Sequence, residues 1–416
     1  MLRSFCSSLL VVIVAVVASV LIQAGCVDDL KPYTSPISGA WLPPMAVFRA
    51  ATKLSAIVDK LAFAVKPPLA QAMTLLGGYQ ATQAIGLFAH MRIAEAIETL
   101  NPGGASEVSS IAAVVGADAD ALRRLLRFLS ALGFVASDGT PATTQFGNTA
   151  ASKLLIKDSP GSVWGAAMSI HTNHYLGWTN LEASIKGGAG VIAFDDKFGM
   201  DYWEYLKKRP EEEEAFAHFM TGLSHGPDAA IATSGANFSE CTGIVDIGGG
   251  HGSLLADVVA AHPALAGKAT VLDLPSVVAS AEPLPGIAFQ GGDFFEPAQI
   301  PKGAATNCYI LKIVLHDWAE DKCIAILNGV TQAMDSAGVP VKARKVYIAE
   351  NMLMSGDPLA SLKLGLDVNM LAMVGGQERT EEEWAGLLAK AGWQQVASYP
   401  TRSIYTVIEA APGASA

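Results

Sequence analysis

The chain has 416 residues, of which 51% are hydrophobic and 16% are charged, and its formal net charge is −11. This length is enough for two domains with cores of their own, and the composition is typical of a globular α/β or α-rich protein. The negative charge disfavours binding to nucleic-acid phosphates. The five cysteines show no CxxC or other metal-type spacing, so we expect buried free thiols and no disulfide framework.

The N-terminus carries a short apolar segment. Arg3 precedes the run LLVVIVAVVASVLI, residues 9–22, which has about the length of a signal-peptide core and is short for a membrane span. Extended to residues 5–26, the segment would make a marginal membrane anchor, and QAGC loosely resembles a bacterial lipoprotein cleavage site at Cys26. We therefore predict a signal or membrane-anchor segment over residues 1–30. The alternative is a misplaced start codon, and the protein would then be cytoplasmic.

The next part of the chain is predicted to be helical. Residues 31–68 are rich in Pro, Ser and Ala, which indicates a linker followed by a packing helix. From Leu69 apolar residues recur every three or four positions, as in an amphipathic helix. Residues 106–139 then predict a short helix, a longer helix and a small hairpin, the layout of a winged helix. Because the chain is acidic, we favour for residues 69–155 a small helical packing domain, which could serve as a dimer interface, over a DNA-binding domain.

From Thr242 short apolar runs alternate with helical stretches. The runs are GIVDIGGG, ATVLDLP, IAFQGGDFF, NCYILKIVLHD, KVYIAENML and SIYTVIEA. This alternation predicts an α/β domain with a doubly wound, mostly parallel sheet of the Rossmann type. Ligands bind such sheets beyond the carboxyl ends of the strands. We assign residues 156–412 to substrate-covering helices followed by this sheet domain.

A glycine-rich turn follows the first predicted strand in IVDIGGGHGSLL. Gly248 and Gly250 let the backbone approach a ligand closely, but a nicotinamide fingerprint would need glycine where Ser253 stands. Asp246 lies inside the strand, and a buried carboxylate is costly unless it meets donors or a cation. S-adenosylmethionine offers an ammonium and a sulfonium group there, whereas a dinucleotide would bring a negative pyrophosphate.

Two further acids follow the next two strands. Asp273 ends the run ATVLDLP, where a carboxylate can accept both ribose hydroxyls; a turn acid before Pro275 is the alternative. Asp293 and Phe294 end the third run, and an acid beside an aromatic ring suits an adenine. Three acids at successive strand ends after one glycine turn favour S-adenosylmethionine as the cofactor.

This set of motifs resembles the S-adenosylmethionine-dependent small-molecule O-methyltransferases of the caffeate, acetylserotonin and bacterial hydroxyneurosporene type. The resemblance runs from about Leu69 to Ile408 and rests on VDIGGGHG, DLP, GDFFE, LKIVLHDW, ENML and GGQERTEEEW. It implies a Rossmann-like methyltransferase domain, a winged-helix domain that forms a homodimer, a small-molecule hydroxyl as acceptor, and no metal.

The resemblance also assigns the catalytic residues. It implies that His316 of LKIVLHDW is the general base, because a histidine with a pKa near ~6.5 is available unprotonated to take a hydroxyl proton. It implies that Glu350 of AENML and Glu378 of GGQERT flank the imidazole ring. From the residues alone, a structural histidine and a metal ligand remain the alternatives. Asp317 is expected to cap the following helix.

Further contacts are implied for the cofactor and the acceptor. Lys312 matches a family lysine that contacts the cofactor, and Trp318 matches the aromatic residue that borders the adenine. The apolar walls of the acceptor pocket are implied at Trp178, Met220 and Met370.

The predicted function is therefore methyl transfer to a hydroxyl of an apolar or aromatic secondary metabolite. Val374 stands where the plant phenylpropanoid enzymes carry a polar asparagine, which favours an apolar acceptor. Two alternatives stay open: the same scaffold with another chemistry, such as decarboxylation or hydroxylation, and a non-catalytic winged-helix binding protein.

Overall fold

The computed structural model describes residues 31–303 and 306–413, which form two compact units. The first unit joins the described residues up to Leu61 with those from Gly226 onward, and the second unit spans Ala62–His225. The predicted signal or anchor segment, residues 1–30, lies outside the described residues. Within the described ranges, no helix combines the length and the apolar character that crossing a membrane requires.

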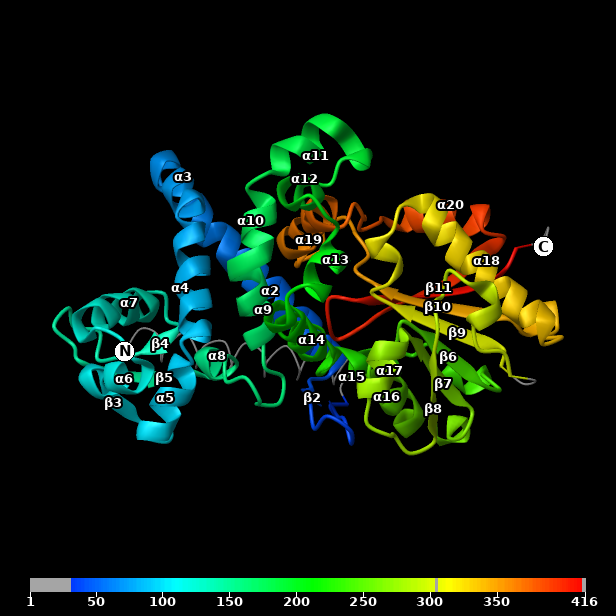
Figure 1. The fold of residues 1–416 in the computed structure, drawn as a ribbon, viewed down its shortest axis with the longest axis horizontal. Helices are drawn as coiled ribbons and strands as arrows, with labels where there is room; N and C mark the ends of the chain where they lie inside the picture. The colour runs from blue at the N-terminus through cyan, green and yellow to red at the C-terminus, as the bar shows by residue number, and fades with distance from the viewer. Residues whose placement is uncertain (1–30, 304–305, 414–416) are drawn as a thin grey trace. The chain divides into compact units, whose positions relative to one another are not determined.

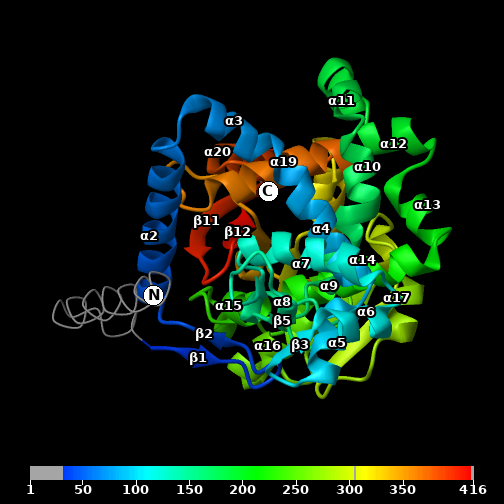
Figure 2. The same ribbon diagram turned by 90° about the vertical axis from the view of Figure 1, so that its left-hand side faces the viewer.

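The second unit consists of helices and one three-stranded antiparallel sheet of order β3-β5-β4 (Figure 2). Its strands are β3 (Ala105–Glu107), β4 (Val135–Ala136) and β5 (Gln145–Asn148). Its helices are α3 (Pro68–Leu76), α4 (Gly78–His90), α5 (Ile93–Leu100), α6 (Val108–Val115), α7 (Ala119–Ala131), α8 (Ala150–Lys153), α9 (Trp164–Ser169), α10 (Tyr175–Trp178), α11 (Leu181–Gly187), α12 (Ala193–Phe198), α13 (Tyr202–Lys207) and α14 (Pro210–Ser224).

The predicted winged-helix layout is present in α6, α7 and the β4–β5 pair. The Asp118 carboxylate caps α7 by accepting a hydrogen bond from the Ala121 amide at 2.8 Å. Leu122, Leu126 and Leu129 follow at helical spacing and are buried on one face of α7. The arginines of this helix lie outside that buried set, as expected for a packing helix.

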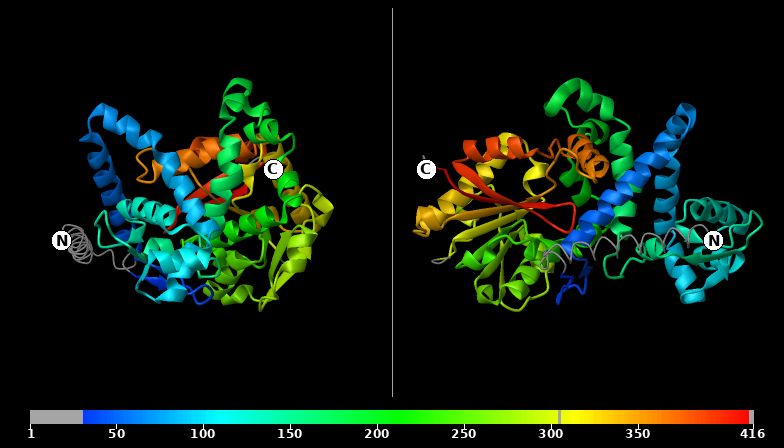
Figure 3. Two further views of the ribbon diagram at one scale, coloured as in Figure 1. Left: turned by 60° about the vertical axis from the view of Figure 1, so that its left-hand side comes forward. Right: turned by 180° about the vertical axis from the view of Figure 1, so that it is seen from behind.

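The first unit is built around a seven-stranded sheet of order β11-β12-β10-β9-β6-β7-β8 (Figure 3). The five strands β10, β9, β6, β7 and β8 are parallel, whereas β12 runs antiparallel between β10 and the edge strand β11. The predicted doubly wound, mostly parallel sheet is thus confirmed. The strands are β6 (Ile244–Ile247), β7 (Ala269–Asp273), β8 (Ile287–Gly291), β9 (Cys308–Lys312), β10 (Lys345–Glu350), β11 (Trp393–Pro400) and β12 (Thr406–Pro412).

Helices cover both faces of this sheet (Figure 1). Alternate side chains of β9 separate the two cores: Tyr309 and Leu311 pack with α18 and α20, whereas Ile310 packs with α16. The central strands are buried on both faces, which is why their sequences are nearly continuous apolar runs. The helices of this unit are α2 (Met45–Ala64), which continues past the unit boundary, α15 (Pro227–Ala232), α16 (Ser253–Ala261), α17 (Pro275–Ser280), α18 (Glu320–Ser336), α19 (Ala360–Met373) and α20 (Glu381–Lys390).

Two elements differ from the sequence prediction. The edge strand β11 was not among the six predicted runs, because its sequence WQQVASYP holds few apolar residues and carries a bulge near Gln395. The first part of the predicted linker forms a β-hairpin of β1 (Tyr33–Thr34) and β2 (Trp41–Leu42).

The prediction of free thiols is wrong for two of the cysteines. Cys241 and Cys308 form a disulfide, with 5.6 Å between their Cα atoms. Cys308 begins β9 and pairs in register with Ile244 of β6, so the strand pairing brings Cys241 next to it. Their separation of 67 residues in sequence gave no sign of this proximity. Cys323 is free and buried, as predicted.

The disulfide closes a loop that contains β6, β7 and β8. We expect reduction to lower the free energy of unfolding by about 4 kcal/mol, because the reduced unfolded chain regains loop entropy. Urea unfolding with and without dithiothreitol measures this difference. A Cys241→Ala/Cys308→Ala variant should be insensitive to dithiothreitol, whereas a Cys323→Ala variant should respond like the unaltered protein; equal responses of both variants would contradict the assignment.

Candidate active site

The predicted glycine turn links the end of β6 to the start of α16. Gly248, Gly250 and Gly252 have φ angles of 70°, 57° and 81°, a region that glycine adopts without strain. A Cβ atom on Gly249 would lie 2.6 Å from the carboxylate of Asp246, so the chain passes too close for any side chain. The turn therefore presents bare backbone at the carboxyl end of the sheet.

Asp246 is buried at the end of β6, directly beneath this turn. Only 1% of its surface is exposed, and among the described residues neither carboxylate oxygen has a hydrogen-bond partner. Burial raises the pKa of Asp246 to about 8, although the charge of Lys312 opposes this shift. A carboxylate in this position is stabilised by an added cation, as the sequence predicted.

Lys312, at the end of β9, is held by an acid that the sequence prediction missed. Its Nζ donates to Oδ1 of Asp228 at 2.6 Å, and the hydroxyl of Ser253 donates to Oδ2 at 2.6 Å. Asp228 is 1% exposed and lies at the start of α15. Only its position directly after Pro227 marks it in the sequence, and that position indicates a helix start and nothing more.

Asp273, the predicted ribose acid, ends β7 and also shapes the glycine turn. Its carboxylate accepts hydrogen bonds from the amides of Gly250 at 2.8 Å and Leu274 at 2.7 Å. Burial raises the pKa of Asp273, and these two hydrogen bonds oppose the shift. The structure thus brings Asp273 and Gly250 into direct contact.

The predicted adenine residues lie beyond β8. Asp293 is exposed and accepts a hydrogen bond from the Phe295 amide at 2.8 Å. Phe294 and Trp318 meet edge to face with their ring centroids 6.2 Å apart, and Phe295 lies closer to Trp318, at 4.8 Å. The structure therefore brings Trp318 next to Phe294, although they come from different strand ends.

The predicted base, His316, lies in a 3-10 turn (Leu315–Asp317) beyond β9 and is surrounded by carboxylates. Its Nδ1 is 3.0 Å from Oε1 of Glu378 and 3.8 Å from Oε2 of Glu350. Its Nε2 is 3.5 Å from Oδ1 of Asp317. All three predicted catalytic residues are thus adjacent, although they are up to 62 residues apart in the chain.

Glu350 builds the turn that carries His316. Its Oε1 accepts hydrogen bonds from three successive amides, those of Val314, Leu315 and His316, at 3.1, 3.0 and 3.3 Å. Ile313, just before them, has a φ of 47°, which is strained for a β-branched residue. The expectation that Asp317 caps the next helix is wrong, because Ala319 holds the N-cap position of α18.

The GGQER segment closes over the same turn. A Cβ atom on Gly376 would lie 1.9 Å from the carbonyl oxygen of His316, and the Gln377 amide donates to that oxygen at 2.8 Å. Arg379 donates to the carbonyl oxygens of Leu315 and Trp318 at 3.1 and 3.0 Å. Gly376 and Arg379 were missed as site residues, because their roles depend on backbone contacts.

The charges around His316 determine which proton form it takes. Burial by itself lowers the pKa of His316, but the carboxylates of Glu350, Asp317 and Glu378 together raise it above its ordinary value. Burial also raises the pKa of Glu350, whose Oε2 has no hydrogen-bond partner among the described residues. These carboxylates therefore favour the imidazolium form of His316, whereas a general base acts from the unprotonated form.

The same three side chains could also hold a metal ion. One ligand atom each of His316, Glu350 and Glu378 lies within 4.8 Å of the others. However, Nδ1 of His316 is hydrogen-bonded to Glu378, so a metal would have to displace that proton.

The three residues predicted to line the acceptor pocket lie on three helices. Trp178 ends α10 and Met220 lies on α14, both in the second unit, whereas Met370 lies on α19 in the first. Their role in acceptor binding stays a prediction.

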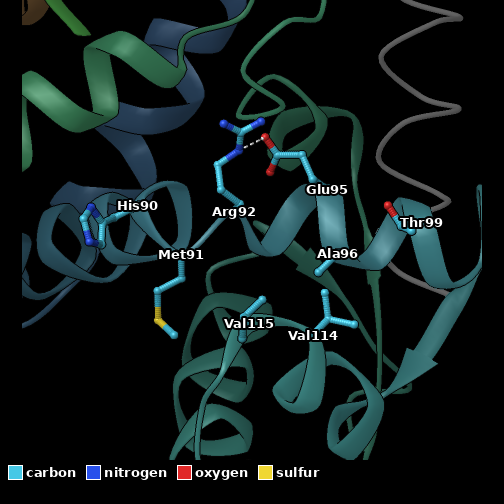
Figure 4. A pocket seen from close by; sticks show the side chains of 8 residues that line it. All are labelled: His90, Met91, Arg92, Glu95, Ala96, Thr99, Val114 and Val115. Carbon is cyan, nitrogen blue, oxygen red and sulfur yellow. Dashed lines mark hydrogen bonds and ion pairs between the residues drawn. The ribbon is translucent and has the colours of Figure 1, made fainter. Parts of the chain in front are cut away.

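A separate hollow of about 530 Å³ lies in the second unit (Figure 4). None of the predicted site residues lines it. An ion pair between Arg92 and Glu95, 2.5 Å long, lies at its rim beside apolar side chains. Its lining residues are His90, Met91, Arg92, Glu95, Ala96, Thr99, Val114 and Val115.

Comparison with known families decides the assignment. Residues 178–394, more than half of the chain, match the O-methyltransferase domain family. Residues 73–158 match the O-methyltransferase dimerisation domain. The chain belongs to the small-molecule O-methyltransferases.

Individual relatives support this family assignment. The (RS)-norcoclaurine 6-O-methyltransferase of Coptis japonica is 32% identical over 311 residues, which are 74% of this chain and 86% of that protein. The phenazine O-methyltransferase PhzM of Lysobacter antibioticus is 30% identical over 82% of this chain and 95% of its own. The solved structure of the O-methyltransferase NcsB1 from neocarzinostatin biosynthesis, with S-adenosylmethionine and 2-hydroxy-5-methyl naphthoic acid, has a TM-score of 0.61 and 27% identity, covering 80% of this chain and 96% of that one.

This O-methyltransferase uses S-adenosylmethionine as its cofactor, as its family does. Two features of the chain fit that molecule. The unpartnered carboxylate of Asp246 suits a positively charged group, and the backbone at Gly249 leaves no room for a side chain. The dimerisation domain supports homodimer formation.

The raised pKa of Asp246 predicts pH-dependent cofactor binding. Below pH 8 the ammonium group of a ligand must displace the proton of this carboxyl, so affinity for S-adenosylhomocysteine, which has this group but no sulfonium, should rise with pH up to about 8 and then level off. Calorimetry between pH 6 and 9 measures the slope. Asp246→Asn should bind more weakly and lose the dependence, whereas Asp321→Asn, a change at an exposed position of α18, should retain it. A flat profile for the unaltered enzyme would contradict the prediction.

Proposed function

We propose that this O-methyltransferase methylates a hydroxyl group of an aromatic or apolar small molecule, with His316 as the general base. The observation that supports this most is the placement of His316, whose Nδ1 contacts Glu378 at 3.0 Å. A hydrogen bond from Nδ1–H to that carboxylate fixes the ring and leaves Nε2 as the atom that accepts the hydroxyl proton.

The cofactor contacts belong to the proposal as well. Asp246, Gly248 and Gly250 are assigned to the methionine side of the site. Asp273 is assigned to the ribose. Asp293, Phe294 and Trp318 are assigned to the adenine, and Lys312 is assigned as a further cofactor contact. Support comes from the shared edge of the sheet: these residues lie at or just beyond the ends of β6, β7, β8 and β9.

The carboxylates around His316 stabilise the positive charge that forms on the ring when it takes the proton. S-adenosylmethionine, when bound, supplies the methyl group and a positive sulfonium. A sulfonium bound nearby would oppose a second positive charge on the ring and so would favour the unprotonated form of His316. The acceptor oxygen would bond to the methyl carbon as the methyl–sulfur bond breaks, S-adenosylhomocysteine would leave, and Nε2 of His316 would take the hydroxyl proton.

The acceptor class follows from two observations. The relatives act, by their names, on norcoclaurine and phenazine, and the NcsB1 structure holds a hydroxylated naphthoic acid. The proposed pocket residues Trp178, Met220, Met370 and Val374 are apolar or aromatic. We assign the acceptor to the aromatic hydroxyl compounds. We also propose that the 43.3 kDa chain forms a homodimer, and sedimentation can measure its mass.

Removing the base tests the proposed mechanism. His316→Ala should lower kcat by about 10²–10⁴-fold on an accepted phenol, because proton transfer contributes a factor of this size. A panel of hydroxylated aromatics with labelled S-adenosylmethionine identifies the acceptor and measures the loss. Affinity for S-adenosylhomocysteine should stay within about threefold, well under 1.4 kcal/mol. His262→Ala is the matched control, and retained transfer in His316→Ala would favour another chemistry on this scaffold.

The carboxylate partner of His316 should set the pH profile. Glu378→Gln removes a negative charge that raises the pKa of His316, so the acid limb of kcat/KM should move by about one unit to lower pH. Glu382→Gln, at an exposed position of α20, should leave the limb in place. A shift to higher pH, or none, would contradict the role of Glu378.

A further inference from the structure

The β1–β2 hairpin packs on the two helices that hold the cofactor edge of the sheet. Leu42 of β2 is 6% exposed and packs with Ala229 and Ala230 of α15, together with Tyr33 of β1. Figure 2 shows the hairpin beside α15 and α16. It precedes both ranges that match the O-methyltransferase families, so its role is not part of the family comparison.

One side chain of the hairpin reaches α16 itself. The hydroxyl of Ser35 donates to Oδ1 of Asp257 at 2.5 Å, and both residues are only 2% exposed. Burial raises the pKa of Asp257 to about 6, and the hydrogen bond from Ser35 opposes that shift. Ser35 is therefore the hydrogen-bond donor that stabilises a buried carboxylate on the helix that follows the glycine turn.

Asp257 lies one helical turn after Ser253, so both side chains are on the same face of α16. Ser253 donates to Asp228, which also accepts from Lys312. The face of α16 is thus held at two points: Ser253 is tied to α15 and Asp257 to the hairpin. Arg402 links the end of α15 to the residue that follows β2, since it donates to the hydroxyl of Thr233 at 2.6 Å and to the carbonyl oxygen of Pro43 at 3.5 Å.

We propose that the hairpin is a positioning element of the cofactor site, in which Ser35 holds Asp257 and thereby sets the position of α16 and the glycine turn. Ser35 touches no reacting group. It acts through α16, and Leu42 acts through α15 and Asp228. This inference rests on the proposed cofactor residues, and it adds a segment that lies outside the matched domains.

Calorimetry with S-adenosylhomocysteine and steady-state kinetics on the full chain test the proposal. Ser35→Ala should weaken binding of S-adenosylhomocysteine and raise KM for S-adenosylmethionine by about tenfold, the loss expected for one hydrogen bond to a buried carboxylate. The value of kcat should change by less than about twofold, because the catalytic cluster around His316 is untouched. Ser35→Thr keeps the hydroxyl and should restore most of the affinity.

Ser38→Ala is the matched control, since it makes the same change in the same hairpin. Among the described residues, the Ser38 hydroxyl accepts a hydrogen bond only from the nearby Ala40 amide. Because the Ser35 hydroxyl also accepts hydrogen bonds from the Ile37 and Ser38 amides, Ser35→Ala could disrupt the hairpin turn. Asp257→Ala removes the acceptor of this hydrogen bond from α16 instead, and its effect should be less than additive with Ser35→Ala.

Two results would overturn the proposal: unchanged affinity in both Ser35→Ala and Asp257→Ala, or an equal loss in Ser38→Ala. An unaltered chain that binds S-adenosylhomocysteine but methylates no aromatic hydroxyl would contradict the proposed function alone, because the readout here is cofactor binding.

Discussion

The carboxylate of Glu350 organises the catalytic end of this O-methyltransferase. One of its oxygens collects three successive amides after β9, and the other lies 3.8 Å from Nδ1 of His316. The same group therefore shapes the turn and contributes to the charge that holds a proton on the imidazole. Because Glu350 is fully buried, loss of its side chain would leave three amides without their acceptor.

A second group of buried acids dominates the cofactor edge. Asp228, Asp246 and Asp257 are each buried near Lys312, which pairs directly with Asp228. Negative charge thus exceeds positive charge among these side chains, and a cationic cofactor offsets the excess. Asp246 remains without a hydrogen-bond partner among the described residues, whereas Asp228 and Asp257 are satisfied by Ser253 and Ser35. This difference supports the proposed assignment of Asp246 to the cofactor, whereas Asp228 and Asp257 hold helices.

The sheet connects the carboxylates around His316 with the buried acids near Lys312. Parallel pairing of β6, β7 and β9 brings Asp246, Asp273 and Lys312 to the same edge, and the turn after β9 places His316 beyond it. The disulfide between Cys241 and Cys308 links the residues just before β6 to the start of β9, at the edge of the sheet opposite the proposed site. The proposed cofactor contacts and the proposed general base therefore depend on the same central strands.

The sequence by itself determined the doubly wound sheet, the winged-helix unit and most of the site, because apolar runs, the glycine turn and acids at strand ends are local patterns. Only the tertiary structure decided which carboxylates surround His316, the contacts of Asp228, the contact between Ser35 and Asp257, and the disulfide. The hydrogen bonds of Asp228 and Ser35 show the range, since they join residues 25 positions apart in Asp228 and Ser253 and 222 positions apart in Ser35 and Asp257. Strand pairing and burial bring them together, and burial is what changes the energy of their charges.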